Sequence, residues 1–546
     1  MSFSVGGGPN RDLLIRKGFL PDSLPPLFTS ERVANSQLFQ IGYNVDQKTV
    51  GRCSTFNGSK RGFQRRVFSL PHPVFVRDVA EFYHEHWSAI AAHFAKAKGS
   101  VSTPKFGSNL SRALRITPHS QLPLMRMNAL SRYKYCLVTD VSRCYPSIYT
   151  HSFPWAINGR KKAKADRKWS SDAVFGNRLD FLFRQMQDGQ TVGIPVGPDI
   201  SRIAGEIILS AVDKRYAPDG ANDGYIRHVD DFWIGGHSLQ DCEDSLHRLR
   251  QSLNYYSLDA NEQKTKIVPM STVISEIWPY DLEMQLKDAL SSGDSNRHDA
   301  RLVSILGNIV GYSIESKDDG IIKFFLRKID NWGAWQDHWD ILEPFLAHVA
   351  IQFPYAFEYV AQIVAWRKEG GGQIDEPLWF DINRTLISDA AVLGRDTEVV
   401  WGLWLAKQLD QKLSEKTFST IAANNSPLVI GLLAHFVSKG CVNKVTDASV
   451  LWKRVEDDGV SGAEWPLSLE LSHLKIERPP SVEMSNNTVL RAMFDANVSL
   501  INWETENFFD DLVETLPEGG GALSRSGWGY EDDDGEDEVI VEVPGD

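Results

Sequence analysis

The sequence has 546 residues, of which 42% are hydrophobic and 24% are charged. At roughly 100–200 residues per domain, this length predicts two to four domains. The composition, with 16 Trp and 27 Phe, excludes a largely disordered chain. No apolar run approaches the roughly 20 residues that cross a bilayer, the first residues contain no apolar leader, and the five cysteines are widely spaced. We therefore expect a cytoplasmic protein with no membrane partner.

The net charge of −13 is unevenly distributed along the chain. Residues 51–268 contain 31 basic and 20 acidic residues, a net charge of +11, so the remainder carries −24. Such a basic region favours a polyanionic partner, because phosphate neutralisation dominates affinity for nucleic acids. Scattered, solvated surface charge explains the same count equally well.

In chain order, residues 1–50 combine three consecutive glycines with a proline-rich stretch, and we expect an arm with little core of its own. Residues 72–98 show the apolar spacing of a helix. The pair His84 and His86 lies on this helix, but side chains two residues apart point to different faces, which favours a structural role over metal binding.

The pattern changes between residues 135 and 235. The segments YCLVTDVSRCY and YIRHVDDFWIGG each predict a short apolar strand that runs into carboxylates. Between them, residues 175–189 and 199–216 predict helices, the first of which ends at Gly189.

From residue 283 to residue 510 the strand signal nearly vanishes, and helical segments follow one another. Their spacing suggests paired helices in the manner of an α-solenoid, and an irregular helical bundle is the alternative. The final residues, 517–546, contain ten acidic residues and one basic residue, which predicts a flexible tail.

Three aspartates carry the chemistry that the sequence predicts. Asp140 ends the first strand, and a carboxylate there is costly to bury unless it is paired or binds a metal. Asp230 and Asp231 follow the second strand and can serve one site only at a tight hairpin, and Gly235 and Gly236 are placed to help shape this turn or its exit. Hard divalent cations prefer such oxygen ligands, and two-metal phosphoryl transfer needs carboxylates that bridge ions about 3.5–4 Å apart.

Three further segments can be interpreted either as functional or as ordinary structural or solvated segments. The loop GIPVGP at residues 193–198 is stiff and allows close backbone approach to a nucleotide, but it also resembles an ordinary start of a helix. Lys264 could hold a phosphate or protonate a leaving pyrophosphate, although surface lysines are usually solvated. The basic cluster at residues 161–168 is a candidate contact for nucleic acid or a solvated loop.

Taken together and in this order, the segments TDVSRCYPSIY, GIPVGPDISRIAGEI, HVDDF and NEQKTKI resemble the palm motifs of reverse transcriptases. The resemblance covers roughly residues 100–270. The second segment, and YPSIYTHSFPWAI after the first aspartate, are most similar to the bacterial antiviral branch. That branch comprises abortive-infection and defence-associated reverse transcriptases, which are related to group II intron and retron enzymes.

The resemblance implies a role for each matching residue. Asp140, Asp230 and Asp231 would hold two Mg²⁺ ions, for which Mn²⁺ can substitute, and Tyr145 would exclude a ribose 2′-hydroxyl and so favour dNTPs. The remaining implied residues contact the nucleotide or the triphosphate, with Lys264 at the late palm position: Arg143, Gly193, Pro195, Gly197, Lys105, Arg112 and Arg115. The sequence departs from the family where His228 replaces the usual aromatic residue and Val192 precedes Gly193 in place of Gln.

The implied fold is α+β. An arm (1–50) precedes reverse-transcriptase-like fingers and palm with an antiparallel sheet (51–282), a HEAT-like all-α repeat domain (283–510) and an acidic tail (511–546). The implied partners are dNTPs, the DNA product, RNA and further copies of the chain.

Three functions remain open at this stage. The first is an antiviral DNA polymerase that works without a template or primes from a protein hydroxyl, for which Tyr530 in the tail is a candidate, although an ordinary tail residue explains Tyr530 as well. The second is an RNA-templated reverse transcriptase that uses a dedicated non-coding RNA. The third is a nucleic-acid-binding scaffold with a degenerate polymerase fold.

Overall fold

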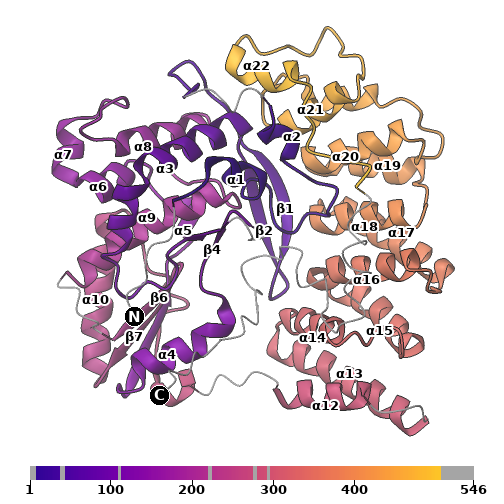
Figure 1. Ribbon diagram of the computed structural model, residues 1–546, viewed down its shortest axis with the longest axis horizontal. Coiled ribbons are helices and arrows are strands. Elements are labelled where there is room, and N and C mark those ends of the chain that lie inside the picture. Colours follow the sequence, from indigo (N-terminus) through magenta and orange to yellow (C-terminus); the bar gives the residue numbers. More distant parts are fainter. Residues whose placement is uncertain are drawn as a thin grey trace, which may run out of the picture.

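The computed structural model describes residues 8–36, 43–107, 112–218, 224–274, 280–291 and 296–505. Figure 1 shows two bodies side by side, a mixed body of strands and helices from the first half of the chain and a stack of helices from the second half. The α+β prediction is therefore confirmed, and the predicted acidic tail lies outside the described residues.

The first body contains most of the strands and the longer helices around them. In chain order its elements are α1 (Arg11–Arg16), α2 (Glu31–Ala34), β1 (Ser54–Lys60), β2 (Gln64–Leu70), α3 (Pro73–Phe94), β3 (Lys105–Phe106), β4 (Leu114–Arg115), η2 (His119–Gln121), α4 (Leu122–Leu130), β5 (Tyr135–Asp140), α5 (Cys144–Ser147), α6 (Ser152–Asn158), α7 (Arg160–Ala165), α8 (Gly176–Gln185), α9 (Asp199–Tyr216), β6 (Tyr225–His228), β7 (Asp231–Gly236), α10 (Leu239–Tyr255), β8 (Lys266–Pro269) and α11 (Met270–Ile274).

The second body is helical throughout its described residues. Its elements are α12 (Tyr280–Leu290), α13 (Asn296–Ser316), α14 (Gly320–Asn331), α15 (Trp339–Gln352), η3 (Pro354–Ala356), α16 (Phe357–Glu369), α17 (Glu376–Val392), α18 (Asp396–Gln408), α19 (Glu415–Asn424), α20 (Pro427–Ser438), η4 (Ser449–Val455), α21 (Trp465–His473) and α22 (Thr488–Asp495).

A four-stranded antiparallel sheet, which we call the palm sheet, organises the first body. Its strand order is β6-β7-β5-β8, so β5 lies in the interior between β7 and β8. Apolar side chains explain this position, because Cys136 and Leu137 of β5 are fully buried. Helix α10 packs on one face of the sheet and α4 on the other, as the contacts of both helices with β7 and their places in Figure 1 show.

Helix α9 is the central helix of the first body and occupies the residues that the sequence predicts. It is buried along most of its length, and its polar residues Glu206 and Asp213 are buried with it. Both carboxylates pair with Arg227 of β6, at 2.8 and 2.7 Å. This buried ion triad fixes α9 against the strand that leads to Asp230.

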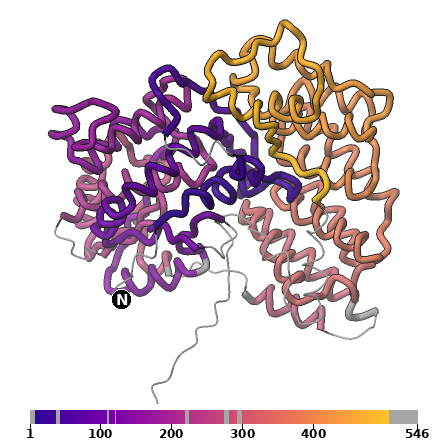
Figure 2. The backbone as a smooth tube through the Cα atoms, turned by 45° about the horizontal axis from the view of Figure 1, so that its top comes forward, coloured from indigo at the N-terminus to yellow at the C-terminus, as the bar shows by residue number. Residues whose placement is uncertain are grey.

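The helices of the second body form a stack in which most helices pack on the next helix and on the one after it. The contacts α16–α18, α17–α18, α17–α19 and α18–α20 illustrate the pattern, and Figure 2 shows the stack as one column of paired helices. This arrangement agrees with the predicted helical repeat. Its core explains the tryptophan content, because Trp335, Trp379, Trp401, Trp404, Trp452 and Trp465 are among the largest fully buried side chains.

The N-terminal arm joins the two bodies. Thr29 donates its backbone N–H to Leu500 at 2.8 Å, and Asn502 donates to Leu27 at 2.8 Å. These bonds, with the bridge between Phe28 and Ile501, form a short clasp between opposite ends of the described chain. The predicted arm therefore packs into a shared core instead of standing alone.

A second junction is the β1–β2 hairpin, which lies between the two bodies in Figure 1. It packs against α18 and α20 of the stack. Among the described helices, none combines the length and apolar composition required to span a bilayer.

The ion triad around Arg227 generates a prediction about stability. Replacing Arg227 with Met leaves Glu206 and Asp213 buried without their counter-charge, which costs about 3–5 kcal/mol. We expect a clearly lower midpoint of thermal unfolding for this variant. The matched control is Arg250→Met, since Arg250 forms only an exposed pair with Glu262 and should unfold close to the wild-type midpoint. Equal midpoints for the two variants would contradict the assignment.

Candidate active site

The three predicted aspartates meet at one end of the palm sheet. Asp140 is the last residue of β5 and lies directly opposite Asp231, the first residue of β7. Asp230 occupies the turn between β6 and β7, and its carbonyl accepts a hydrogen bond from Val141 at 3.1 Å. The sequence prediction that these residues share a hairpin site is thus matched by the geometry.

The turn itself is made by Val229 and Asp230, because His228 and Asp231 are paired across it. Val229 has φ +52, a left-handed conformation that β-branched residues rarely adopt. Two groups hold it there: Ser102 Oγ accepts its N–H, and Arg227 Nη1 donates to its carbonyl at 2.9 Å. The turn is strained, and its surroundings fix it.

Gly235 and Gly236 do not shape this turn, which corrects the prediction. They lie at the far end of β7, opposite Cys136 and Tyr135. A Cβ on Gly235 would come within 2.3 Å of the Tyr133 ring, so close ring packing accounts for that glycine.

The electrostatics of the site are dominated by burial and by repulsion between like charges. Burial, followed by the charges of Asp230 and Asp140, raises the pKa of Asp231 to about 7. Burial, with the charge of Asp140, also raises the pKa of Asp230. Such shifts are typical of buried carboxylates that share one site.

Lys264 supplies one counter-charge. Its Nζ donates to Asp140 Oδ2 at 2.6 Å, and this hydrogen bond raises the pKa of the lysine. The loop that carries it is anchored to the end of β5, since Asn261 donates to the Asp140 carbonyl at 2.9 Å. The lysine side chain remains 66% exposed, so it can leave Asp140 without unfolding the loop.

The donor set fits hard divalent cations. The three side chains are carboxylates, the donors that such cations prefer, and Asp140 Oδ1 is buried with no hydrogen-bond partner. Within the described residues, no three His, Cys, Asp or Glu side chains are drawn together into an assembled metal site. Lys264 engages Asp140, so a metal ion would compete with it for this carboxylate.

Tyr145 and the glycine loop form one wall of the site. Ile194 donates its N–H to the Tyr145 carbonyl at 3.0 Å, and Gly193 donates to Ile148 at 2.8 Å. The Tyr145 ring lies over Gly205 of α9, where a Cβ would come within 3.5 Å of its hydroxyl. Burial raises the pKa of this tyrosine, with Asp230 among the nearby charges, so it is a neutral group close to the carboxylates.

The glycine loop also contacts the β1–β2 hairpin. Gly197 has φ +121, and a Cβ there would lie 2.9 Å from the Phe68 ring of β2. Ser69 donates to the Val196 carbonyl at 2.9 Å, and Pro195 is buried. The predicted glycine loop therefore contacts Tyr145 on one side and the β1–β2 hairpin on the other.

Residues of the helical stack hold the hairpin by its backbone and its arginines. Asp319 accepts from the Gly62 N–H at 2.6 Å, and Asp318 accepts both Nε and Nη2 of Arg61 at 2.7 and 2.6 Å. The same pattern recurs along the hairpin. Its further bonds are Asn57 N–H to Asp396 at 2.6 Å, Ser59 N–H to Thr397 at 3.1 Å and Arg65 to Glu398 at 2.5 Å.

The hairpin is the functional segment that sequence reasoning missed. Arg66 lowers the pKa of Asp230 and Lys60 lowers that of Asp231, although in both cases burial outweighs this effect. Both cations lie at the hairpin tip, in the string SKRGFQRR. The sequence feature that could have indicated this segment is the high density of positive charge around Gly62.

The cations predicted to bind a triphosphate lie in different environments. Arg112 is held by Asp22 and by Asp199, at 2.8 Å from the latter, and it also donates to the Leu20 carbonyl. These two carboxylates give this arginine a structural role, and its contact with a triphosphate stays a prediction. Lys105 and Arg115 face each other across β3 and β4, and their contact with a triphosphate stays a prediction.

Two further predicted positions are placed by the structure. Arg143 is exposed and has φ +44 at the start of α5, two residues before Tyr145. His228 is buried, contacts the Thr117 carbonyl at 2.8 Å and packs edge-on against His119. Burial lowers the His228 pKa to about 4, so this residue is a neutral packing group behind the turn.

His86 confirms the structural reading of the histidine pair. Its ring stacks on Phe175 at 4.4 Å and contacts Phe82 at 4.8 Å. Tyr530 lies outside the described residues.

Comparison with known proteins gives one family match, which covers part of the chain. Residues 85–301 match the family model "Reverse transcriptase (RNA-dependent DNA polymerase)", which spans all three aspartates and Lys264. No curated protein matches the chain.

Solved structures of telomerase from Candida tropicalis share part of the geometry. The apo enzyme gives a TM-score of 0.30 at 11% identity, over 75% of this chain and 69% of that one. A form truncated from its C-terminal domain gives 0.25 at 14% identity over 44% of this chain, and this chain spans about half of that form, 52%. The complex with a TWJ fragment of telomeric RNA gives 0.27 at 14% identity, over 66% and 65%. At these TM-scores the likeness is partial.

The hairpin contacts generate a second prediction. In the double variant Asp318→Asn, Asp319→Asn the hairpin loses the two charged acceptors at its tip, and hydrogen bonds to charged groups are worth about 1.5–3 kcal/mol. We expect trypsin to cleave at Arg61, Arg65 and Arg66 roughly tenfold faster than in wild type, because local opening controls cleavage. We also expect slower dNTP incorporation.

The matched control is Asp381→Asn, Asp410→Asn, which removes two exposed acids from the same stack. Protection from trypsin equal to wild type in the first variant, or equal cleavage in both variants, would show that the acids do not hold the hairpin.

Proposed function

We propose that the protein is a metal-dependent nucleotidyl transferase that synthesises DNA from dNTPs, a function supported by the match of residues 85–301 to the reverse transcriptase family model. The observation that carries this proposal is the meeting of Asp140, Asp230 and Asp231 at the end of the palm sheet, with an unpartnered oxygen on Asp140. Raised pKa values at Asp230 and Asp231 add to it, since a bound cation would relieve the repulsion that produces them.

The three aspartates would hold two Mg²⁺ or Mn²⁺ ions. When bound, such ions activate a primer 3′-hydroxyl and neutralise the triphosphate and the leaving pyrophosphate. The exposed ammonium of Lys264, released from Asp140, can reach a phosphate and donate a proton to the leaving group. Lys60 and Arg66 on the hairpin add positive potential on the other side of the carboxylates.

Tyr145 would set the choice of sugar. Its backbone is fixed by Ile194, and its ring is supported by Gly205, so its position does not adapt easily to an added hydroxyl. A fixed ring at the nucleotide site would exclude a ribose 2′-hydroxyl and favour dNTPs.

We further propose that the activity serves antiphage defence, without a template, with a protein primer, or with both. The motifs GIPVGPDISRIAGEI and YPSIYTHSFPWAI, and the helical stack behind the polymerase, support this assignment. The second candidate is an RNA-templated reverse transcriptase with a dedicated non-coding RNA, which the family match supports directly. The third candidate, an inert scaffold, is disfavoured because the three carboxylates and Lys264 are together.

Sequencing the nucleic acid bound to the purified protein, before and after protease treatment, separates the first two candidates. One defined RNA with its cDNA supports templating, whereas homopolymeric or random DNA supports synthesis without a template. DNA that stays covalently attached in wild type but not in Tyr530→Phe would identify a protein primer, and unchanged attachment would exclude that tyrosine.

The carboxylates provide the central test of catalysis. Asp230→Asn with Asp231→Asn keeps the shape of the turn but removes two metal ligands. We expect dNTP incorporation to fall by about a thousandfold or more, since metal ions stabilise the transition state by several kcal/mol. The control is Asp244→Asn, an exposed residue of α10. Wild-type protein that is inert with Mg²⁺ or Mn²⁺, all dNTPs and varied templates would favour the scaffold.

Tyr145 provides a test of sugar selection. We expect Tyr145→Val to incorporate rNTPs with a kcat/KM roughly tenfold or more above wild type, because the smaller side chain opens space for a 2′-hydroxyl. Rates with dNTPs should change less than rates with rNTPs. An unchanged ratio of dNTP to rNTP incorporation would remove Tyr145 from the site of discrimination.

A further inference from the structure

A cavity of about 940 Å³ opens on the first body, away from the three aspartates. It lies where the end of α6, the start of α7, the end of α9 and the second half of α10 come together. Helix α9 links the two places: Gly205 packs on Tyr145, whereas Arg215 lines the cavity ten residues later, about 15 Å along the helix. Figure 1 shows these four helices on the side of the first body that faces away from the helical stack.

The cavity is lined by cations that have no carboxylate partner. Arg160, Lys214, Arg215 and Arg248 line it, and none of its described lining residues is acidic. None of the four forms an ion pair within the described chain. Arginines in the rest of the body, such as Arg112 and Arg227, each meet two carboxylates.

The helix dipole accounts for only part of this charge. Lys214 and Arg215 lie in the last turn of α9, where the negative end of the dipole stabilises cations. Arg160 begins α7 and Arg248 lies within α10, so neither has this support. Since no acidic residue lines the cavity, an anionic ligand would offset the positive charge gathered there.

The same cations are arranged on aromatic rings. The Arg160 guanidinium lies 4.5 Å from the Trp155 ring and 5.0 Å from the Tyr255 ring, and Arg215 lies 4.2 Å from Tyr255. Arg248 lies 5.2 Å from Tyr216. Cations packed on rings keep a defined position while their N–H groups stay available to a phosphate. Trp155 and Tyr255 are only half-buried, so part of each ring is open to a ligand.

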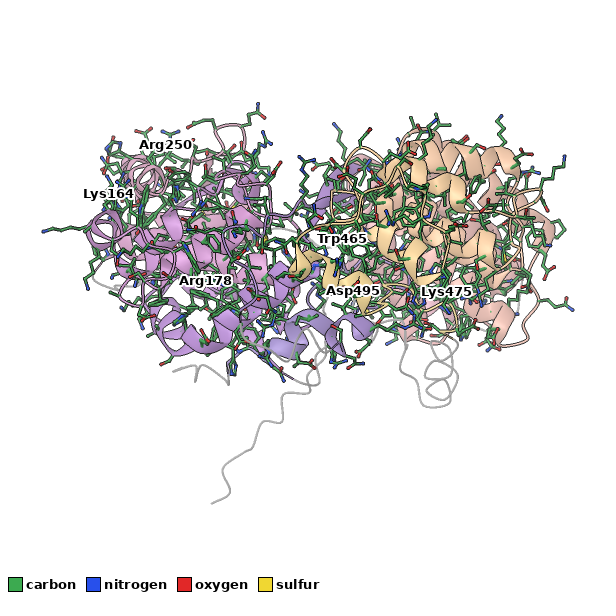
Figure 3. The ribbon with its side chains drawn as sticks, turned by 90° about the horizontal axis from the view of Figure 1, so that it is seen from above. Lys164, Arg178, Arg250, Trp465, Lys475 and Asp495 are labelled. Carbon is green, nitrogen blue, oxygen red and sulfur yellow. The ribbon has the colours of Figure 1, made fainter. Side chains whose placement is uncertain are left out.

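The positive surface extends from the cavity along α7 and the loop behind it. Lys161, Lys162, Lys164, Arg167 and Lys168 are all exposed there. Figure 3 places Lys164 at the end of the molecule farthest from the helical stack. Cavity and helix together form a basic track with aromatic rings at one end.

We propose that this track binds a single strand of nucleic acid outside the catalytic centre, with phosphates along residues 160–168 and bases stacked in the cavity on Trp155 and Tyr255. Positive grooves with aromatic platforms bind single strands in this way with little dependence on sequence. The cavity is large enough for a nucleotide. RNA and DNA share the phosphates and the stacking faces, so either strand fits the chemistry.

The test measures binding of 5′-labelled 20-nucleotide RNA, DNA of the same sequence and duplex DNA to the full-length chain by fluorescence anisotropy in EDTA. The variant is Arg160→Gln, Arg215→Gln, and its matched control is Arg384→Gln, Lys416→Gln, which removes two exposed cations of the helical stack. We expect the variant to bind single strands roughly tenfold more weakly. The slope of log K against log salt should fall by about 1.4, since each contact with a single strand contributes about 0.7.

A second variant separates stacking from charge. Tyr255→Leu keeps an apolar side chain but loses the stacking face, so we expect roughly tenfold weaker binding with an unchanged salt slope. Unchanged affinity and slope in the arginine variant, or an equal loss in its control, would overturn the proposal. Preference between the RNA and DNA probes identifies which strand the track holds.

Crosslinking covers the case in which a variant does not fold. Wild-type protein crosslinked to a 5-iodouracil-containing strand should yield labelled peptides from residues 155–168, 214–216 or 248–255. Labelled peptides that come only from other regions would overturn the proposal. The test does not depend on catalysis, so inactive protein that still binds through the track would reject the proposed polymerase and keep this site.

Discussion

Repulsion among three carboxylates at the end of one sheet is the constraint on which the rest of the structure depends. Asp140, Asp230 and Asp231 are brought together by strand register, and burial removes the water that would screen them. Cations from two separate segments reduce this repulsion. They are Lys264, in the loop anchored to the end of β5, and the cations at the tip of the β1–β2 hairpin. The fold also holds a strained turn at Val229 by means of an arginine that α9 fixes in place.

The helical stack takes part in this arrangement through the hairpin. Its acidic residues, at the first turn of α18 and before α14, bind hairpin backbone and arginines, so the position of Lys60 and Arg66 depends on a domain that contains none of the three aspartates. This contact also explains part of the uneven charge of the sequence, in which residues 51–268 carry a net charge of +11. Part of the basic excess is neutralised internally, as in the pairs of Arg61 with Asp318 and Arg65 with Glu398, while the outer face of the first body keeps unpaired cations.

The local patterns of the sequence were sufficient for the palm. The apolar run before Asp140 and the spacing within residues 199–216 predicted β5 and α9, because each depends on neighbours in the chain. The ion pairs of Arg112 could not be predicted, since its partners Asp22 and Asp199 are distant in sequence. The hydrogen bonds between the hairpin and the helical stack could not be predicted for the same reason, because they join residues 57–65 to residues 318–398. The role of Gly235 was predicted wrongly because the aromatic ring that packs against it, Tyr133, belongs to another segment.

The clasp between Leu27–Thr29 and Leu500–Asn502 has a consequence for biosynthesis. The helical stack separates its two halves in the sequence, so the arm is synthesised well before the residues that it binds. At about 5–20 residues per second this interval lasts tens of seconds. The polymerase half can collapse during that time, but the arm is secured only when the last helices emerge. A ribosome that stalls within the stack would therefore release a first body whose arm and hairpin lack their partners, so the integrity of the site depends on synthesis of the last helices of the stack.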